Sequence, residues 1–137
     1  MDAYLQEIKQ FIAVWPDSSS RCRDLFIQLK THLLSLEGIR IQFAARPGVT
    51  YSLRAGHANQ GDRTLFAMID VIDDDPRWLS ICFYSEMVSD PEARGDYVPG
   101  GLLGEDGLCF DLEPGDEELV SYVTARIDEA HRAARSS

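Results

Sequence analysis

The sequence predicts an α+β domain of two layers, in which helices cover one face of a mostly antiparallel, five-stranded sheet. Apolar residues recur every three or four positions near both ends of the chain, and they alternate with polar residues between positions 39 and 54. A length of 137 residues and an apolar fraction of 45% fit one globular domain. We therefore expect a single domain over residues 1–137 with the element order α-α-β-β-β-β-β-α.

Two amphipathic helices are expected to fill residues 1–38 as a helical pair. The first begins behind a cap at Asp2 and runs to about Val14, because Pro16 ends it. The second follows a polar stretch that offers several capping side chains, and it ends at Gly38. Their apolar stripes are Leu5, Ile8, Phe11, Ile12 and Trp15 in the first helix, and Cys22, Phe26, Leu29, Leu33 and Leu36 in the second.

The middle of the chain is expected to form the sheet. Residues 39–43 and 49–54 alternate apolar and polar side chains around a turn at 46–48, which predicts a β-hairpin. Residues 64–72 and 78–84 are apolar on both faces, as in strands near the middle of a sheet. The connection between these two strands is short, so they are predicted to pair antiparallel.

A long loop is predicted at residues 89–107, within the sheet segment 39–112. It contains five glycines and two prolines, which are too many for a regular element, and loops of this length are often functional. A short strand at 108–112 completes the sheet. The last element is a helix over 116–135, capped by Asp116, with acidic residues in its first turn and basic residues in its last.

The charge balance argues against nucleic-acid binding. The chain has 13 basic and 23 acidic residues, for a formal net charge of −10, whereas phosphate recognition requires clustered cations. The charge is uneven, because residues 62–129 hold 18 acidic residues against four arginines while the rest of the chain is net positive. Since a surface of one sign steers association, an acidic surface that competes for a basic partner is one function to consider.

We expect a cytoplasmic, reduced protein that does not enter a membrane. No apolar run approaches the ~20 residues that span a bilayer, and residues 1–10 lack the basic and apolar regions of a signal peptide. The chain has an odd number of cysteines, Cys22, Cys82 and Cys109. Cys82 and Cys109 lie on predicted strands that can bring them close across the sheet, but we interpret all three as small buried hydrophobic residues.

No metal site and no cofactor are expected. Zinc requires about four ligands, and the sequence has neither a CxxC nor an HxxxH pair. The acidic turn at 73–75 is typical of a solvated hairpin tip. A calcium loop starting at Asp90 fails, because Arg94 occupies its fifth position and Gly101 stands where a bidentate glutamate is needed.

Three residues are candidates for catalytic chemistry. Asp70 lies inside an apolar strand and must be paired if it is buried. His57 is the only histidine in a predicted polar loop, where functional residues concentrate. A small hydrolase or metal-dependent enzyme would use His57, Asp70 and Asp90 as general bases or ligands. The candidate charge partners of Asp70 are Arg40, Arg54 and Arg63.

We favour a non-catalytic module that binds a small ligand or a protein partner over the hydrolase and over the acidic surface. The reason is the loop at 89–107, which carries more apolar side chains than a solvated loop needs. The expected binding residues are Arg54, His57, Arg94 and Tyr97. A homodimer is consistent with the sequence, because an edge strand or this loop offers a surface to a two-fold mate, although no residue pattern establishes it.

Overall fold

A computed structural model describes residues 2–137, together with the side chains of residues 3–137, and confirms the α+β architecture with six strands in place of five. The helices are α1 (Asp2–Ala13), α2 (Ser20–Leu34) and α3 (Glu117–Arg135). The strands are β1 (Ile39–Arg46), β2 (Thr50–His57), β3 (Ala67–Ile72), β4 (Trp78–Tyr84), β5 (Asp96–Leu102) and β6 (Glu105–Leu112). They form one antiparallel sheet in the order β1-β2-β3-β4-β6-β5.

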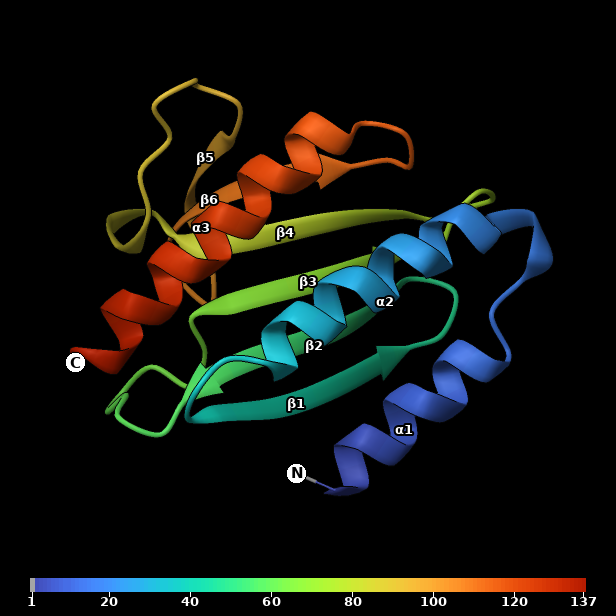
Figure 1. The fold of residues 1–137 in the computed structure, drawn as a ribbon, viewed down its shortest axis with the longest axis horizontal. Coiled ribbons are helices and arrows are strands. Elements are labelled where there is room, and N and C mark those ends of the chain that lie inside the picture. Colours follow the sequence, from blue (N-terminus) through green and yellow to red (C-terminus); the bar gives the residue numbers. More distant parts are fainter. Residues whose placement is uncertain (1) are drawn as a thin grey trace.

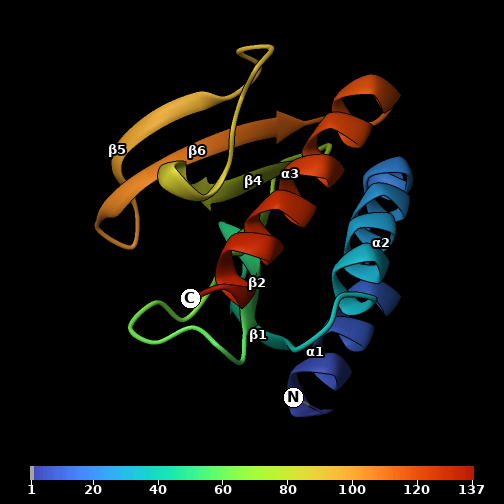
Figure 2. The ribbon, with the colours of Figure 1, turned by 60° about the vertical axis from the view of Figure 1, so that its left-hand side comes forward.

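All three helices lie on the same side of the sheet, which leaves its other face without a helix (Figures 1 and 2). Helices α2 and α3 run across the sheet, and α1 packs beside the edge strand β1. The expectation of helices on one face is therefore confirmed. No helix within residues 2–137 is long and apolar enough to cross a membrane.

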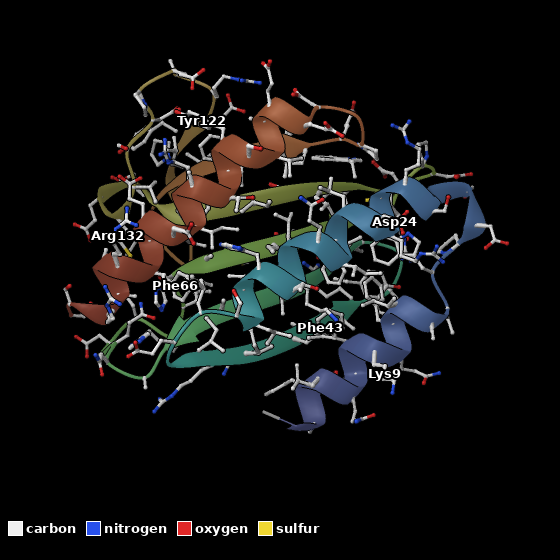
Figure 3. The ribbon with its side chains drawn as sticks, in the orientation of Figure 1. Lys9, Asp24, Phe43, Phe66, Tyr122 and Arg132 are labelled. Atoms are coloured by element: carbon white, nitrogen blue, oxygen red, sulfur yellow. A yellow bond between two sulfur atoms is a disulfide. The ribbon has the colours of Figure 1, made fainter. Side chains whose placement is uncertain are left out.

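The core lies between the helices and one face of the sheet. A single row of cross-strand neighbours supplies large apolar side chains from five strands, and each is almost fully buried. The row consists of Phe43, Leu53, Ile69, Ile81 and Phe110. Phe43, labelled in Figure 3, faces α1, and its ring centroid lies 5.4 Å from that of Phe11 in this helix. Burial of one such side chain contributes about 2 kcal/mol, so this row alone fixes which face the helices cover.

The predicted loop at 89–107 is wrong for most of its length, because it contains β5 and the start of β6. These strands form a hairpin with an irregularity between Val98 and Leu102. The proline within β5 is tolerated because β5 lies at the edge of the sheet. Gly104 turns the hairpin with a φ of +86°. The turn-forming residues therefore mark an irregular edge hairpin, and only a short loop precedes it.

Most other predicted boundaries differ by a few residues. Helix α1 ends at Ala13, α2 ends at Leu34 and β3 begins at Ala67. The cap of α3 is confirmed, since Asp116 Oδ1 accepts a hydrogen bond from the Leu119 N–H at 3.0 Å. The expected cap at Asp2 falls outside the described side chains. The antiparallel pairing of β3 with β4 is also confirmed.

The structure corrects the interpretation of two of the three cysteines. Cys82 of β4 and Cys109 of β6 lie directly opposite each other, with Cα atoms 4.1 Å apart, and form a disulfide. They are therefore not merely buried hydrophobic residues, and the expected fully reduced state does not hold here. The pairing was missed because β6 pairs with β4 across the chain order, and its register cannot be derived from spacing. Cys22 is free and buried, as expected.

Candidate functional site

His57 closes the end of β2 and is buried, with 5% of its surface exposed. Its Nδ1 accepts a hydrogen bond from the Asn59 N–H at 3.0 Å, and its ring packs against His131 of α3 with centroids 5.3 Å apart. A Cβ atom at Gly38 would overlap the imidazole ring. His57 therefore fills a space beneath Gly38 and does not face an open site.

Arg54 and Asp70 lie on the helix-free face of the sheet. Burial raises the pKa of Asp70, while a hydrogen bond with the Ser52 hydroxyl and the charge of Arg54 oppose that rise. Arg54 is thus the charge partner of Asp70 among the three arginines expected. Arg63 is engaged elsewhere, since it pairs with Glu105 and with Glu86.

Asp90 holds the short loop that precedes β5. Its carboxylate accepts hydrogen bonds from the N–H groups of Arg94 and Gly95, both at 2.9 Å, and from the hydroxyl of Tyr122. Tyr122 extends from α3 toward this loop (Figure 3). Burial alone would raise the pKa of Asp90, but these hydrogen bonds outweigh it and lower the pKa. The guanidinium of Arg94 lies 3.5 Å from Asp116, so it also helps to fasten the loop to α3.

The structure does not bring the predicted site residues together. His57 contacts α3 at His131 and Asp90 contacts it at Tyr122, which are about 13 Å apart along the helix axis at 1.5 Å per residue. Asp70 lies on the opposite face of the sheet. Tyr97 is exposed on the β5–β6 hairpin, where its hydroxyl donates to Asp106 Oδ2 at 2.6 Å. Within residues 2–137, no three His, Cys, Asp or Glu side chains are grouped so as to hold a metal ion.

A groove of about 750 Å³ lies at the other end of the sheet and was not predicted. Three segments line it: residues 18–22 at the start of α2, residues 74–78 in the β3–β4 connection, and residues 113–114 after β6. Figure 1 shows these segments together on the right-hand side of the molecule. A second hollow of about 740 Å³ shares Arg21 and Trp78 with the first, and it extends the groove toward the start of α3.

Arg77 anchors one wall of the groove. It is 8% exposed, and its Nε donates to Asp73 Oδ1 at 3.0 Å. Its guanidinium carbon lies 4.8 Å from the ring centroid of Trp15 and about as far from two further aromatic rings. Its Nη1 has no hydrogen-bond partner among the described residues. Burial alone would raise the pKa of Asp73, but hydrogen bonds from the Gly48 N–H and from Arg77 lower it, so this pair is charged and fixed.

The start of α2 forms another wall of the same groove, and its Ser20 N–H already donates to the Asp17 carbonyl oxygen. No side chain caps this helix, because the Ser19 hydroxyl accepts a hydrogen bond from the Arg77 N–H at 2.9 Å instead. The guanidinium of Arg21 lies against the loop at Gly115, 3.2 Å from where a Cβ would stand. No ion pair of Arg21 is found in the described part of the chain. This side of the groove therefore carries hydrogen-bond donors and positive charge.

The opposite side of the groove is acidic and aromatic. Trp78 is half-buried, and its Nε1 donates to Asp74 Oδ2 at 2.8 Å, which fixes the indole ring. Asp111 and Glu113 lie next to it and form no ion pair with any described residue. Burial, Asp96 and Glu113 together raise the pKa of Asp111. Among the described residues, no cation lies within ion-pair distance of either carboxylate.

Cys22 does not supply a nucleophile to the groove. It lies at the groove wall, but burial raises the pKa of its thiol to about 11, and the charge of Arg77 only partly opposes that rise. A thiol with such a pKa is uncharged at neutral pH and reacts slowly. The groove therefore offers charge, hydrogen bonds and an aromatic surface, which suit binding.

Sequence reasoning missed the residues of this groove because they come from three short connections. Arg21, Trp78 and Glu113 lie far apart in the sequence, and each is unremarkable in its own segment. The one available signal was the absence of a capping box at the start of α2, where Arg23 stands in place of a glutamate. Comparisons with known proteins add no relative: no family model, no curated protein and no solved structure matches this chain.

Proposed function

We propose that the protein is a non-catalytic, cytoplasmic binding module, and that its groove takes an extended segment of a partner protein that presents a basic side chain. The observation that carries the proposal is an open groove in which an aromatic ring, Trp78, lies beside two carboxylates that form no ion pair with any residue the structure describes. An arginine or lysine of the ligand supplies the missing positive charge.

The two sides of the groove suit the two kinds of group that a peptide carries. A guanidinium or ammonium group stacks on Trp78, which is worth about 0.5–2 kcal/mol, and pairs with Asp111 and Glu113. Main-chain carbonyl oxygens of the same segment accept hydrogen bonds from the guanidinium of Arg21. Since the donors and acceptors of the groove lie on opposite sides, they set the direction in which the segment binds.

The net charge favours the same class of ligand. The chain carries a formal charge of −10, and its acidic residues concentrate between residues 62 and 129, which include the acidic side of the groove. A field of one sign draws oppositely charged partners and raises their association rate. The favoured partner is therefore basic, and the groove supplies the site where one of its side chains docks.

A titration of short peptides tests the proposal. The probe is a blocked peptide in which glycine and arginine alternate, compared with the same peptide carrying glutamate in place of arginine. We expect the arginine peptide to bind and to change the fluorescence of Trp78, and the glutamate peptide to do neither. The double variant Asp111→Asn, Glu113→Gln should weaken binding by roughly ten-fold, since two ion pairs are lost.

The matched control is Asp62→Asn with Glu92→Gln. These substitutions remove the same two charges from exposed positions outside the groove. The control should bind the arginine peptide almost as tightly as the unaltered protein at 0.15 M salt, because distant charges are screened. Equal weakening in the control and in the groove variant would mean that net charge alone governs binding, and the proposed site would be wrong.

A further inference from the structure

The disulfide lies on the face of the sheet that no helix covers. Cys82 and Cys109 share one cross-strand row with Met68 of β3 and Asp96 of β5. Their neighbours along the strands, Ile81 among them, point the other way into the core. The two sulfur atoms are therefore on the helix-free side of the molecule.

The bridge is not needed to hold the two strands together. Strands β4 and β6 pair in register from Leu79 opposite Leu112 to Tyr84 opposite Gly107, and the cysteine pair lies inside this ladder. Backbone hydrogen bonds on both sides of the pair fix the register whether or not the sulfur atoms are bonded. The same fold thus accommodates both the disulfide and two opposed thiols.

The two cysteines differ in access, and both differ from the third. Cys109 is half-buried, whereas Cys82 is 6% exposed and its sulfur lies 3.9 Å from the Ser80 hydroxyl. Cys22, on the inner face of α2, is 1% exposed and has a raised pKa, so it is inert toward the same reagents. A small reagent that approaches the helix-free face meets Cys109 first.

We propose that Cys82 and Cys109 form a reversible thiol–disulfide exchange site whose co-reactant is a low-molecular-weight disulfide, such as glutathione disulfide. The Cys109 thiolate attacks one sulfur of the small disulfide, forms a mixed disulfide and releases one small thiol. The Cys82 thiolate then attacks Cys109 Sγ and displaces the second small thiol. Two electrons pass from the cysteine pair to the small disulfide, and the two protons of the cysteine thiols go to solvent or to the released thiols. An excess of the small thiol runs the same steps in reverse.

The cellular setting proposed above makes this exchange the expected behaviour of such a pair. In a reducing compartment, a disulfide that forms at all is usually transient, catalytic or redox-sensing. Oxidation closes a covalent link between positions 27 residues apart, which restricts the unfolded chain and stabilises the folded one. The oxidised form is expected to melt about 10 °C above the reduced form.

The test uses the full chain, incubated in buffers with a graded ratio of reduced to oxidised glutathione, then alkylated and weighed intact. We expect a two-electron transition that is the same from either direction, and the same in Cys22→Ser. Cys82→Ser should accumulate a mixed disulfide with glutathione at Cys109, because the second thiolate is missing. Cys109→Ser should react much more slowly, because Cys82 is less accessible.

Three results would overturn the proposal. One is a disulfide that withstands a large excess of reduced glutathione in the folded protein, and another is a reduced pair that excess glutathione disulfide leaves unoxidised. The third is loss of the near-ultraviolet circular dichroism on reduction, which would show that the bridge is required for the fold. None of these measurements depends on the groove, so a failure of peptide binding leaves this inference standing.

Discussion

The two ends of the sheet differ in whether their charged side chains form ion pairs within the protein. At the end where β2 finishes, Arg63 pairs with Glu86 and with Glu105, and it lies 4.1 Å above the ring centroid of Tyr84. At the end where β4 begins, Arg21 and Glu113 form no ion pair with any residue that the structure describes. The first end pairs its charges within the chain, whereas the second pairs Arg77 with Asp73 but leaves Arg21 and Glu113 free for a ligand.

The same contrast holds for the polar loop around His57, which the sequence suggested as a functional site. The polar loop around His57 is held by Gln60, whose amide accepts from the His57 N–H at 2.9 Å and donates to the Leu65 carbonyl at 2.8 Å. Asn59 donates to the Arg135 carbonyl at 2.8 Å and ties the loop to α3. A loop rich in glycine and polar residues is therefore structural here, and the unpredicted groove is the better site.

The largest expected effect is at the groove wall. Arg77→Leu removes a buried guanidinium that pairs with the half-buried Asp73 and contacts three aromatic rings, so the free energy of unfolding should fall by about 3 kcal/mol. Arg46→Leu is the control, since Arg46 is exposed and unpaired among the described residues and should change stability by less than about 0.5 kcal/mol. Urea unfolding measures both, and similar values for the two variants would show that Arg77 is not an anchor.

The packing of His57 beneath Gly38 gives the next largest effect. Gly38→Ala puts a methyl group into the His57 ring at a backbone φ of +70°, so we expect a loss of about 2–3 kcal/mol. Gly48→Ala has a similar φ of +80° but open space around it, so it should cost only about 1 kcal/mol. If urea unfolding gives the two variants the same loss, His57 is not tightly packed and its assignment as a structural residue is wrong.

More of the fold than of the site could be predicted from the sequence. Helices and strands follow from patterns among neighbouring residues, whereas the site combines residues that are far apart in the sequence. The stripe that contains Phe26 and Leu29 and the strand from Trp78 to Tyr84 follow from local periodicity, and the structure confirms them. The hairpin of β5 and β6 was missed, because an edge strand tolerates Pro99 and its glycines, and local rules then mistake it for a loop.

The groove depends instead on which connections meet at one end of the sheet. Trp78 and Glu113 are brought together by the strand order, in which β6 inserts between β4 and β5. The pairing of Cys82 with Cys109 depends on the same insertion. Neither follows from spacing in the sequence, because non-local strand pairing is set by the packing of the whole domain.

Two aspartates, Asp90 in the loop before β5 and Asp70 on β3, should respond oppositely to pH. The pKa of Asp90 is lowered by its hydrogen bonds, so its contribution to stability is fully present above its ordinary pKa near 3.9 and is lost as the pH falls through its folded value. Asp90→Asn should therefore cost about 1–2 kcal/mol at pH 7, and the difference from the unaltered protein should shrink below about pH 4.

The contribution of Asp70 to stability should depend on pH in the opposite direction. Its pKa is raised by burial, so the ionised carboxylate opposes folding increasingly as the pH rises above its ordinary pKa. Asp70→Asn should leave the melting temperature unchanged or raise it at pH 7, and this gain should disappear below about pH 4. A loss of stability in Asp70→Asn at pH 7 would mean that Arg54 and Ser52 stabilise the carboxylate more than burial opposes it.

The smallest expected change in melting temperature comes from substituting one glutamate at each end of the sheet. Glu105→Gln removes a partner of Arg63 and should lower the melting temperature, and 0.5 M salt should reduce the difference because it screens the pair. Glu113→Gln should not lower the melting temperature, since Glu113 pairs with no described cation and raises the pKa of Asp111. A charged side chain that is unpaired within the protein, and whose removal does not lower the melting temperature, is available to pair with a ligand. Equal losses at both ends would mean that Glu113 already has a partner within the chain, and the groove would then lack the unpaired carboxylate on which its proposed specificity depends.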